Sequence, residues 1–475
     1  MTSIAVERNL AISLHDGTVL AGDLYRPTDD RPHPVLLNFY PYRKDDIIGS
    51  LFDGTRRRFV ERGYADLLVD MKGTGGSEGN YGETFNLQRE GRDAAEVVEW
   101  AAAQDWCDGS VGVWGVSYGG FMAFASAAEK PAHLKAIVSV YATTDNRERL
   151  APHGCPAWFG MYSWAAHMLA MDLLPPTCQD TDGRWWRTWQ QRLRRMEKEL
   201  PHGLEWQVHS PDDAYWSEGR IDATRIEVPT LLIAGWRDIF TDAMVEIFRA
   251  LPGRRQLVVG PWLHVVPHLS EIEPWDWVGA MSDWWDQYLM PGGRDGRTGA
   301  SVVYFAQGAN TWHRDECWPP TGTSEKQLYL AGGCLDSETQ PEAEVHRYAG
   351  DPTVGVAAGI LDPFGTGLGW PEEQSVDDVR SLTFTTGPLG APLEIAGSPS
   401  AELFVAIDGD LEAQLSVKLS AVGPDGRSRL ITRGIYRCRP GAPVTLESND
   451  KTGPPTGPVV GGPVVGGPVV GGPVV

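Results

Sequence analysis

The sequence predicts an α/β protein, in which a parallel β-sheet covered by helices on both faces is followed by an all-β domain. Two observations support this prediction. Between residues 34 and 141, short apolar stretches typical of strands alternate with stretches whose apolar residues recur at helical spacing. After about residue 298, short strand-like stretches at residues such as 301–305, 326–330, 381–385 and 401–407 alternate with Gly, Pro and Asp turns, and no long helical pattern returns.

The N-terminal part of the chain provides the first elements of the predicted sheet. Asp16 and Gly17 lie between two stretches of alternating apolar and polar residues, which is typical of a tight hairpin over residues 9–23. Apolar residues recur at three- and four-residue spacing over residues 90–103, which predicts an amphipathic helix. The same criteria predict strands at residues 34–40, 64–69, 110–114 and 134–141, and a helix of small residues at 121–128.

The alternation of strands and helices stops between residues 147 and 216. This stretch is rich in Trp, Arg and Glu and contains a helical pattern over residues 185–200. We therefore expect a helical cap that is inserted over the sheet. The sheet pattern then resumes, with strands predicted at residues 229–234 and 256–259 and helices at 241–251 and 281–289.

Five regions follow from these patterns. The last of them repeats Gly-Gly-Pro-Val-Val, and this density of Pro and Gly is incompatible with regular structure. The regions are the first part of the α/β core at residues 1–146, the helical cap at 147–216, the second part of the core at 217–298, a β jelly-roll domain at 299–450 and a disordered tail at 451–475.

The composition excludes several classes of function. A net charge of −22 repels phosphate backbones and anionic lipids, so we expect neither nucleic acid nor a membrane as a partner. No apolar stretch reaches the roughly 18 residues that span a bilayer, and the first residues lack the pattern of a signal peptide, which predicts a cytoplasmic protein. The six cysteines form no C-x-x-C pair, so we expect reduced, buried thiols and no structural zinc site.

Residues 115–119 form the motif Gly-Val-Ser-Tyr-Gly. A predicted strand precedes this motif and a predicted helix follows it, as in the nucleophile elbow of the α/β-hydrolase fold. The glycines leave room for a sharp turn, and the N-terminus of the helix favours negative charge that develops at the reacting centre. Ser117 is therefore the predicted nucleophile, and the alternative is a Gly-rich turn in an inactive domain.

A serine hydroxyl needs a base, and in this fold an acid and a histidine follow later strands in the order Ser, Asp, His. Asp238 lies just past the strand predicted at residues 229–234 and is the expected acid. His264 lies in the loop after the next predicted strand and is the expected base. The alternatives are Asp145 and Asp242 for the acid and His268 for the base.

An acyl-transfer reaction also needs two hydrogen-bond donors for the oxyanion of its tetrahedral intermediate. The backbone N–H of Tyr118, directly after the nucleophile, is the first expected donor. The second donor usually belongs to the loop after an early strand, where residues 39–44 lack the His-Gly-Gly run of many lipases. The hydroxyl of Tyr42 is a candidate there, and a purely packing role is the alternative.

Short motifs in both halves of the chain together resemble one family. The motifs are Pro41-Tyr42, Glu61-Arg62-Gly63-Tyr64-Ala65, the Gly-rich segment at residues 73–79, residues 115–120, Gly235-Trp236-Arg237-Asp238, residues 260–264, residues 308–312 and Trp318-Pro319. Over roughly residues 10–440, the chain resembles the cocaine-esterase and Xaa-Pro dipeptidyl-peptidase family of serine hydrolases.

The resemblance implies an α/β-hydrolase core, a helical cap inserted after the sixth strand and a C-terminal jelly roll. It implies the triad Ser117, Asp238 and His264, and an oxyanion hole formed by the Tyr42 hydroxyl and the Tyr118 N–H. It implies no cofactor. After the stretch that matches residues 415–439, the family's jelly roll continues where this chain turns to its repeat, so we expect a shortened sandwich with unpaired, aggregation-prone edges.

These predictions point to hydrolysis of an acyl ester or amide through an acyl-enzyme intermediate. An Xaa-Pro dipeptidyl-peptidase is the second hypothesis, and a catalytically inactive binding protein is a third. The expected substrate is a small ester, amide or short peptide, and a homo-oligomer is left open. Aromatic residues of the cap are candidates for the acyl pocket, with packing inside the cap as the alternative; they are Trp158, Tyr162 and Trp164, together with Trp185 and Trp186.

Overall fold

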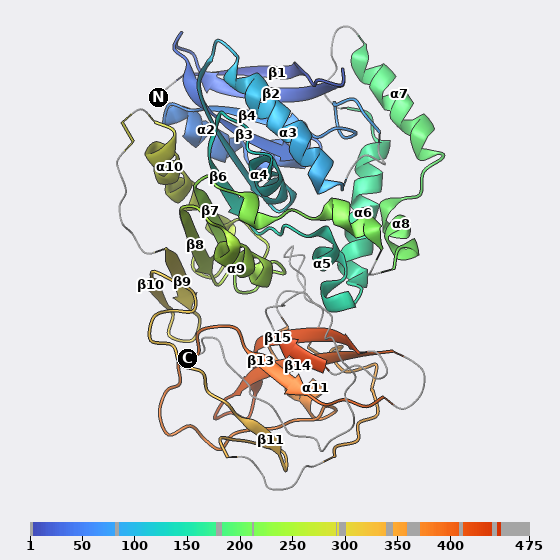
Figure 1. Cartoon of the computed structure of the whole chain (residues 1–475), viewed down its shortest axis with the longest axis vertical. Coiled ribbons are helices and arrows are strands. Elements are labelled where there is room, and N and C mark those ends of the chain that lie inside the picture. The colour runs from blue at the N-terminus through green and yellow to red at the C-terminus, as the bar shows by residue number, and fades with distance from the viewer. Residues whose placement is uncertain are drawn as a thin grey trace.

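A computed structural model gives the fold of the chain (Figure 1). The residues that the structure describes are 3–80, 85–176, 183–210, 213–290, 292–293, 301–338, 345–358, 371–407, 412–438 and 444–447. The side chains at positions 47, 158–161 and 444–447 also lie outside this description. The predicted tail at residues 451–475 lies wholly outside the described residues, and its disorder stays a prediction.

Within the described residues, the main sheet has ten strands in the order β1-β2-β4-β3-β5-β6-β7-β8-β9-β10. Neighbouring strands run parallel from β4 to β9, whereas β1, β2 and β10 pair antiparallel at the two edges. The strands are β1 Ile4–Ser13, β2 Val19–Pro27, β3 His33–Tyr40, β4 Ala65–Asp70, β5 Cys107–Val116, β6 Leu134–Val140, β7 Thr230–Gly235, β8 Arg255–Gly260, β9 Val302–Ala306 and β10 Thr311–Asp315.

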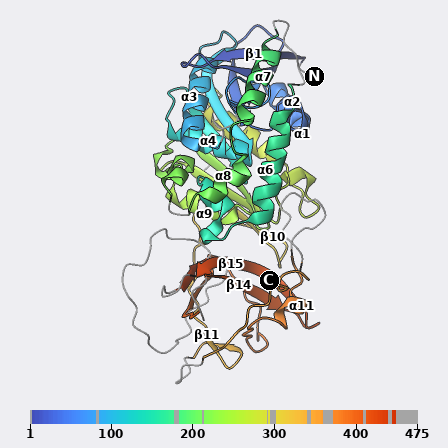
Figure 2. The same ribbon diagram turned by 90° about the vertical axis from the view of Figure 1, so that its right-hand side faces the viewer.

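Helices cover both faces of this sheet, so its central strands are buried on both sides (Figure 2). On one face, Trp114 of β5 contacts Phe59 of α2 and Trp277 of α10 at ring distances of 5.5 and 6.2 Å. On the other face, α3 and α4 pack so closely that a Cβ on Gly91 would lie 2.7 Å from the carbonyl oxygen of Ala125. The helices are α1 Ile47–Leu51, α2 Asp53–Glu61, α3 Leu87–Ala102, α4 Tyr118–Ala128, α9 Thr241–Ala250 and α10 Trp277–Tyr288.

The predicted helical cap is confirmed, because the chain forms a series of helices between β6 and β7. Arg43, in the loop after β3, joins this cap to the core: its guanidinium donates to the carbonyl oxygens of Met171 at 3.1 Å, Leu174 at 2.9 Å and Pro175 at 2.6 Å. These carbonyls lie at the C-terminal end of α6, where a helix leaves such groups without partners. The cap elements are α5 Asn146–Leu150, η2 Pro152–Gly154, α6 Trp158–Leu173, α7 Arg184–Met196, α8 His202–Val208, η3 Ala214–Gly219 and η4 Ala223–Arg225.

The strand expected at residues 301–305 belongs to the main sheet and not to the all-β region. β9 pairs parallel with β8 through Leu257, Val258 and Val259, and the hairpin to β10 closes this edge. The edge of β8 presents backbone groups that need partners, and β9 is the next strand along the chain. The division into domains stays a prediction, and the hydrogen bonds of the sheet cross its proposed boundary at residue 298.

After β10 the described chain forms two-stranded antiparallel ladders, isolated bridges and one short helix. The strands expected at residues 326–330 and 381–385 are reduced to β11 and to a single bridge between Cys334 and Thr385. The ladders join β11 with β12, β13 with β16 and β14 with β15. The elements are β11 Tyr329–Ala331, β12 Cys334–Asp336, α11 Ser375–Asp378, β13 Ser400–Leu403, β14 Ala413–Val422, β15 Ser428–Cys438 and β16 Val444–Glu447.

The C-terminal region is thus a β region of hairpins, as the fold class predicts, and its arrangement as a jelly roll stays a prediction. Among the described residues, no helix has the length and apolar composition needed to cross a lipid bilayer.

Candidate active site

Ser117 occupies the sharp turn that the sequence predicts, between the end of β5 and the start of α4. Its backbone has φ 58° and ψ −120°, a region that residues with a side chain rarely adopt. The turn is held by three backbone hydrogen bonds: the Ser117 N–H donates to Val140 O at 2.8 Å, and the Ser117 carbonyl accepts from Gly120 and Phe121 at 2.8 and 3.0 Å. Ser117 keeps part of its surface accessible, although its neighbours are buried.

Three glycines around Ser117 allow this turn because no Cβ would fit at their positions. A Cβ on Gly115 would lie 2.3 Å from the backbone of Gly119, and one on Gly119 would lie 2.7 Å from the ring of Tyr40. A Cβ on Gly120 would lie 2.8 Å from Ala142. The hydroxyl of Tyr40, the last residue of β3, also accepts the N–H of Val116 at 2.9 Å, so β3 helps to hold the turn in place.

Asp238 and His264 lie together at the carboxyl ends of β7 and β8. The Nδ1 of His264 is 2.5 Å from Oδ2 of Asp238, and the side chains are 5% and 1% exposed. The other carboxylate oxygen of Asp238 accepts the Phe240 N–H at 2.8 Å, which fixes the orientation of the carboxylate. Backbone hydrogen bonds join the two loops: Trp236 donates to Gly260 at 2.8 Å and Arg237 donates to Trp262 at 3.1 Å.

Aromatic contacts connect this pair with the serine turn. Tyr141 directly follows Val140, the residue that binds the Ser117 N–H, and its ring lies 5.5 Å from the ring of His264. Phe121, one turn along α4 from Ser117, lies 5.4 Å from Phe240, which in turn lies 5.5 Å from His264. Ser117, Asp238 and His264 thus all lie just after the carboxyl ends of parallel strands, β5, β7 and β8, as the order of the sequence motifs predicts.

The alternative acids and base lie in other contacts or elements. Asp145 caps α5, and its carboxylate accepts the N–H groups of Arg147 and Glu148 at 2.8 and 3.3 Å. Asp242 lies in the first turn of α9. Nδ1 of His268 accepts the indole N–H of Trp277 at 2.7 Å.

Tyr42 and Tyr118 lie on the cap side of Ser117. Burial raises the pKa of the Tyr42 hydroxyl above its usual value, and hydrogen bonds with Trp164 and Ser117 oppose that rise. The indole N–H of Trp164 donates to the Tyr42 hydroxyl at 3.2 Å. Tyr118 is the first residue of α4, so its N–H belongs to the groups that a helix leaves without an internal partner. The Tyr42 hydroxyl and the Tyr118 N–H thus both lie next to Ser117.

Glu90 supports the site, and the sequence analysis did not identify it. Its carboxylate oxygens accept the Tyr118 hydroxyl at 2.8 and 3.1 Å, and the N–H of Phe85 at 2.8 Å. Burial raises the pKa of Glu90 to about 7. A signal existed, because Glu90 continues the apolar stripe of its helix, four residues before Ala94, where a carboxylate needs a partner.

The three predicted pocket residues have different outcomes. Trp164 lies at the site: it stacks on Tyr118 at 6.1 Å and contacts Tyr42 at 6.5 Å. Tyr162 lies on α6 beside α8, where a Cβ on Gly203 would be 3.5 Å from its ring. The side chain of Trp158 lies outside the described residues. Trp206 of α8, which the prediction did not include, stacks on Trp164 at 6.0 Å.

Two expectations about cysteine and metal chemistry can be compared with the structure. Cys107, Cys155 and Cys438 are free and buried, as expected, whereas the free thiols of Cys317 and Cys334 are exposed. The described part of the chain contains no group of three or more His, Cys, Asp or Glu side chains that could hold a metal ion. The absence of a cofactor stays a prediction.

Comparisons with known proteins cover almost the whole chain. Residues 16–266 match the family model described as X-Pro dipeptidyl-peptidase (S15 family), and residues 297–447 match the X-Pro dipeptidyl-peptidase C-terminal non-catalytic domain. The cocaine esterase of a Rhodococcus species is 29% identical over 92% of this chain and 83% of its own length.

Solved structures show the same fold. A CocE/NonD family hydrolase from Staphylococcus aureus aligns with a TM-score of 0.73 at 18% identity, over 98% of this chain and 83% of that chain. An α-amino acid ester hydrolase aligns with a TM-score of 0.72 at 22% identity, over 99% of this chain and 87% of that chain. These structural similarities confirm the predicted fold, an α/β-hydrolase core followed by a C-terminal β region.

Proposed function

Because the chain belongs to the X-Pro dipeptidyl-peptidase S15 family and is a serine hydrolase, we propose that Ser117, His264 and Asp238 are its catalytic triad. The observation that carries the proposal is the strained turn at Ser117. This turn lies at the carboxyl ends of the parallel strands, where His264 and Asp238 form a close pair. A strained backbone at a nucleophile is typical of sites that hold a reacting group in place.

The proposed reaction begins with attack of the Ser117 hydroxyl on the carbonyl carbon of an ester or amide. His264 takes the serine proton at Nε2, because Asp238 holds the proton of Nδ1. The negative charge moves to the carbonyl oxygen, where the Tyr118 N–H and the Tyr42 hydroxyl stabilise it. The raised pKa of Tyr42 keeps this hydroxyl protonated at neutral pH, so it remains a donor.

The intermediate then collapses to an acyl-enzyme. The bond to the leaving alcohol or amine breaks, and His264 gives its proton to that group. A water molecule, deprotonated by His264, attacks the acyl carbon, and the carboxylic acid product leaves Ser117 as the hydroxyl regains its proton. Each proton that His264 accepts is returned in the same half-reaction.

An acyl ester or amide is the first proposed substrate, and an Xaa-Pro peptide is the second because the matching family model carries that description. The two substrates make different demands on the site. A dipeptidyl-peptidase must hold the ammonium group of its substrate, which requires carboxylates or other acceptors near the acyl pocket.

A fluorophosphonate probe tests the triad directly. We expect the probe to label the wild-type protein at Ser117 and to leave Ser117→Ala unlabelled. Ser126→Ala is the matched control, because Ser126 also lies on α4 and its hydroxyl only donates to Ala123 O at 3.1 Å. Folded wild-type protein that takes up no probe would contradict the proposed triad.

Kinetics on two substrates then decide between the proposed classes. A p-nitrophenyl acyl ester reports esterase activity, and Ala-Pro-p-nitroanilide reports release of an Xaa-Pro dipeptide. We expect a higher kcat/KM for the ester. A clear preference for the nitroanilide would favour the dipeptidyl-peptidase.

A further inference from the structure

The hydroxyl of Tyr42 has one hydrogen-bond partner in the cap and another at the serine turn. The indole N–H of Trp164, on the cap helix α6, donates to this hydroxyl at 3.2 Å, and Tyr42 is also hydrogen bonded with Ser117. An indole N–H can only donate, so the Tyr42 oxygen must be the acceptor from Trp164. The proton of the Tyr42 hydroxyl therefore remains available for a different group, on the side of Ser117.

Aromatic rings and a guanidinium fix the position of Trp164. Its ring stacks on the rings of Tyr118 and Trp206, with centres 6.1 and 6.0 Å apart. The guanidinium carbon of Arg149 lies 4.3 Å from the centre of the Trp164 ring, where a cation is attracted to an aromatic face. Close packing on several sides leaves a side chain few rotamers, so the indole N–H keeps its direction toward the tyrosine hydroxyl.

The residue after Tyr42 contacts the C-terminal end of the same cap helix. The guanidinium of Arg43 donates to three carbonyl oxygens there, at distances between 2.6 and 3.1 Å. Arg43 is 2% exposed, and a charge-assisted hydrogen bond is stronger where water is excluded. Helix α6 is thus bound to two consecutive residues of the loop after β3, to Tyr42 through Trp164 and to Arg43 at its own C-terminal end.

The backbone of Arg43 has an unfavourable conformation. Its φ is 62°, in the left-handed region that residues with a side chain rarely adopt, and such a conformation persists only where surrounding contacts impose it. The Arg43 side chain is bound to α6 and also pairs with Asp46. The N–H of the next residue, Lys44, donates to Oδ1 of Asp70 at 2.6 Å. Loss of the contact with α6 should let this backbone relax, and the adjacent Tyr42 should then shift.

We propose that Trp164 and Arg43 are positioning residues, through which the cap helix α6 holds the Tyr42 hydroxyl in the direction of the oxyanion. This inference rests on the proposed function, because it assumes that Tyr42 donates to the oxyanion of an ester or amide. A donor of an oxyanion hole is effective only if it is already in position when the charge develops. The donor itself thus belongs to the core, whereas the cap sets its orientation.

A double-mutant cycle with Tyr42→Phe tests the role of Trp164 on a p-nitrophenyl acyl ester. Tyr42→Phe removes the hydroxyl and should lower kcat by about 10²- to 10³-fold. Trp164→Phe keeps an aromatic ring but removes the N–H, and it should lower kcat by about 3- to 10-fold. In the Tyr42→Phe background, the same substitution should lower kcat by less than about 2-fold, because the hydroxyl that it orients is absent.

A second cycle tests Arg43. Arg43→Met should lower kcat by about 10- to 100-fold in the wild type, because it removes charge-assisted hydrogen bonds, but by less than about 3-fold in the Tyr42→Phe background. Arg43→Lys should recover part of the loss, because it keeps a charged donor. Arg255→Met is the matched control: Nη1 of Arg255 donates to Leu251 O at 2.6 Å, at the C-terminal end of α9, and its loss should leave kcat unchanged.

The outcomes separate this inference from the proposed function. If the losses of Trp164→Phe and Arg43→Met simply multiply with that of Tyr42→Phe, the two residues do not act through the hydroxyl, and only the inference is overturned. A Tyr42→Phe enzyme with wild-type kcat would contradict the proposed oxyanion hole and the inference together. Thermal melts monitor the folding of each variant, and the Trp164→Phe cycle decides if Arg43→Met does not fold.

Discussion

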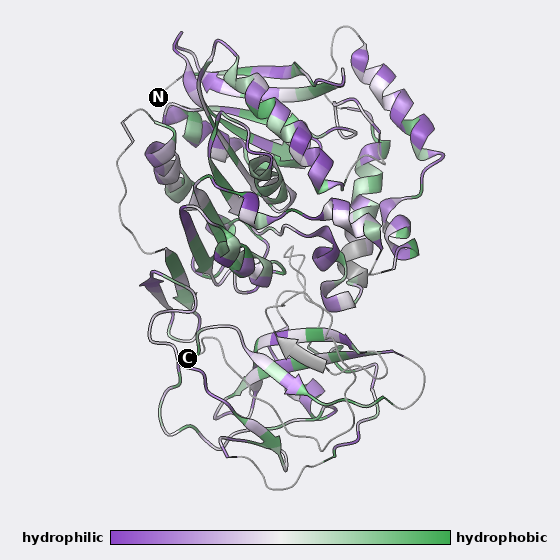
Figure 3. Cartoon of the chain, viewed as in Figure 1, coloured by the Kyte–Doolittle hydropathy of each residue, from purple (hydrophilic) through white to green (hydrophobic). Residues whose placement is uncertain are grey.

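The main sheet and the region after β10 contain similar apolar residues but bury them to different extents. In the sheet region, one continuous core extends from Ile12 to Tyr304 and also includes Trp318, just after β10, and the hydrophobic colours concentrate on the central strands (Figure 3). In the C-terminal region, the second core cluster contains only Ala401 and Cys438 as fully buried members among the described residues. Val345 and Val379 there are 74% and 84% exposed.

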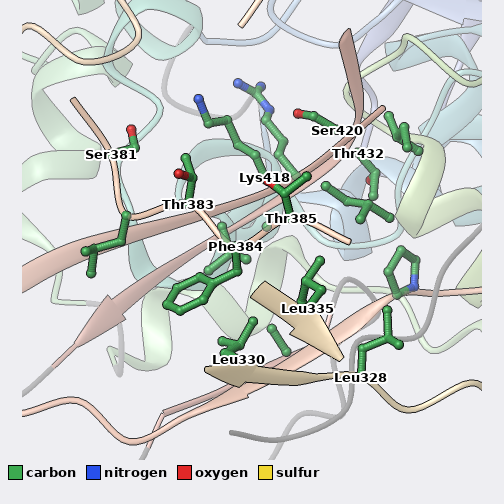
Figure 4. Close-up of a pocket in the computed structure, with 18 of the residues that line it drawn as sticks. Leu328, Leu330, Leu335, Ser381, Thr383, Phe384, Thr385, Lys418, Ser420 and Thr432 are labelled. Carbon is green, nitrogen blue, oxygen red and sulfur yellow. The ribbon is translucent and has the colours of Figure 1, made fainter. Parts of the chain in front are cut away.

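A wide hollow occupies the C-terminal region and explains part of this difference (Figure 4). The hollow is lined by Leu330 of β11, Leu335 of β12 and Leu328, which precedes β11. Phe384 lies among these leucines. The hollow lies between ladders of two strands each, and a ladder of two strands buries too little apolar surface to be stable by itself.

The pKa values of carboxyl groups also differ between the two regions. In the sheet region, burial raises the pKa of Asp66 and Asp70 to about 6. In the C-terminal region, hydrogen bonds from Arg429 and from Ser375 lower the pKa values of the exposed carboxyls of Asp425 and Glu373. Asp66 and Asp70 thus lie in a water-poor interior, whereas Asp425 and Glu373 are exposed to water. The predictions below test whether catalysis, stability, pH response and reactivity divide between the two regions in this way.

The largest expected effect is on catalysis. Asp238→Asn should lower kcat by about 10⁴-fold, because the amide would favour the wrong tautomer of His264. Asp351→Asn, an exposed carboxylate of the C-terminal region whose oxygen accepts the Thr353 N–H at 2.8 Å, should leave kcat unchanged. Steady-state kinetics on a p-nitrophenyl ester measure both variants. A comparable loss in Asp351→Asn would mean that catalysis depends on both regions.

The second-largest effect is expected on the free energy of unfolding. Leu67→Ala should lower the free energy of unfolding by about 2–5 kcal/mol, because Leu67 of β4 is 0% exposed and its loss leaves a cavity. Leu382→Ala should cost less than about 1 kcal/mol, because Leu382 beside the hollow is 49% exposed. Urea denaturation followed by circular dichroism compares the two variants. Equal losses of unfolding free energy in the two variants would show that the hollow is closed in solution.

A smaller effect is on the pH dependence of stability. The folded pKa of Asp66 is about 6, above the ordinary value near 4, so the folded state binds a proton first as pH falls. Stability contributed by this group is therefore gained between pH 6 and pH 4, by up to about 3 kcal/mol. Asp66→Asn should flatten the rise of Tm in that window.

Asp425 should behave in the opposite way. Its folded pKa is lowered, chiefly by the hydrogen bond from Arg429, so its contribution is present above about pH 4 and is lost as pH falls further. Asp425→Asn should therefore lower Tm above about pH 4, and its difference from the wild type should disappear as pH falls below that value. Thermal melts of the wild type and both variants between pH 3 and pH 7 check the two signs, and parallel curves for all three proteins would contradict the assignment.

The smallest effect is expected from the cysteines. Iodoacetamide should modify Cys317 and Cys334, which are exposed, and should leave Cys107 unmodified in the folded protein. Burial raises the pKa of Cys107 to about 11, so little reactive thiolate is present at neutral pH. Peptide mass spectrometry locates the modified residues. Esterase activity should not change on labelling or on addition of a reductant, and rapid modification of Cys107 would show that the sheet region opens.

Local patterns made the fold of the sheet region predictable. The turn at Asp16 and Gly17, the stripe of α3 and the elbow at Ser117 each depend on a few neighbouring residues, and the structure has them near the predicted positions. The strand at residues 302–306 was recognised as a strand but assigned to the wrong sheet. Its pattern contains no information about its partner, because β8 lies some forty residues earlier.

Local sequence patterns were sufficient to predict that a strand, a tight turn and a helix surround Ser117, and that Asp238 and His264 follow later strands in the order of an α/β-hydrolase. These features depend on backbone geometry over a few residues. The tertiary structure alone decided that Glu90 binds Tyr118, that Trp164 rather than Tyr162 lies beside Tyr42, and that Arg43 binds the carbonyls at the end of α6. Such contacts depend on how a cap from one part of the chain packs on a sheet from another, and packing between distant segments leaves no local pattern.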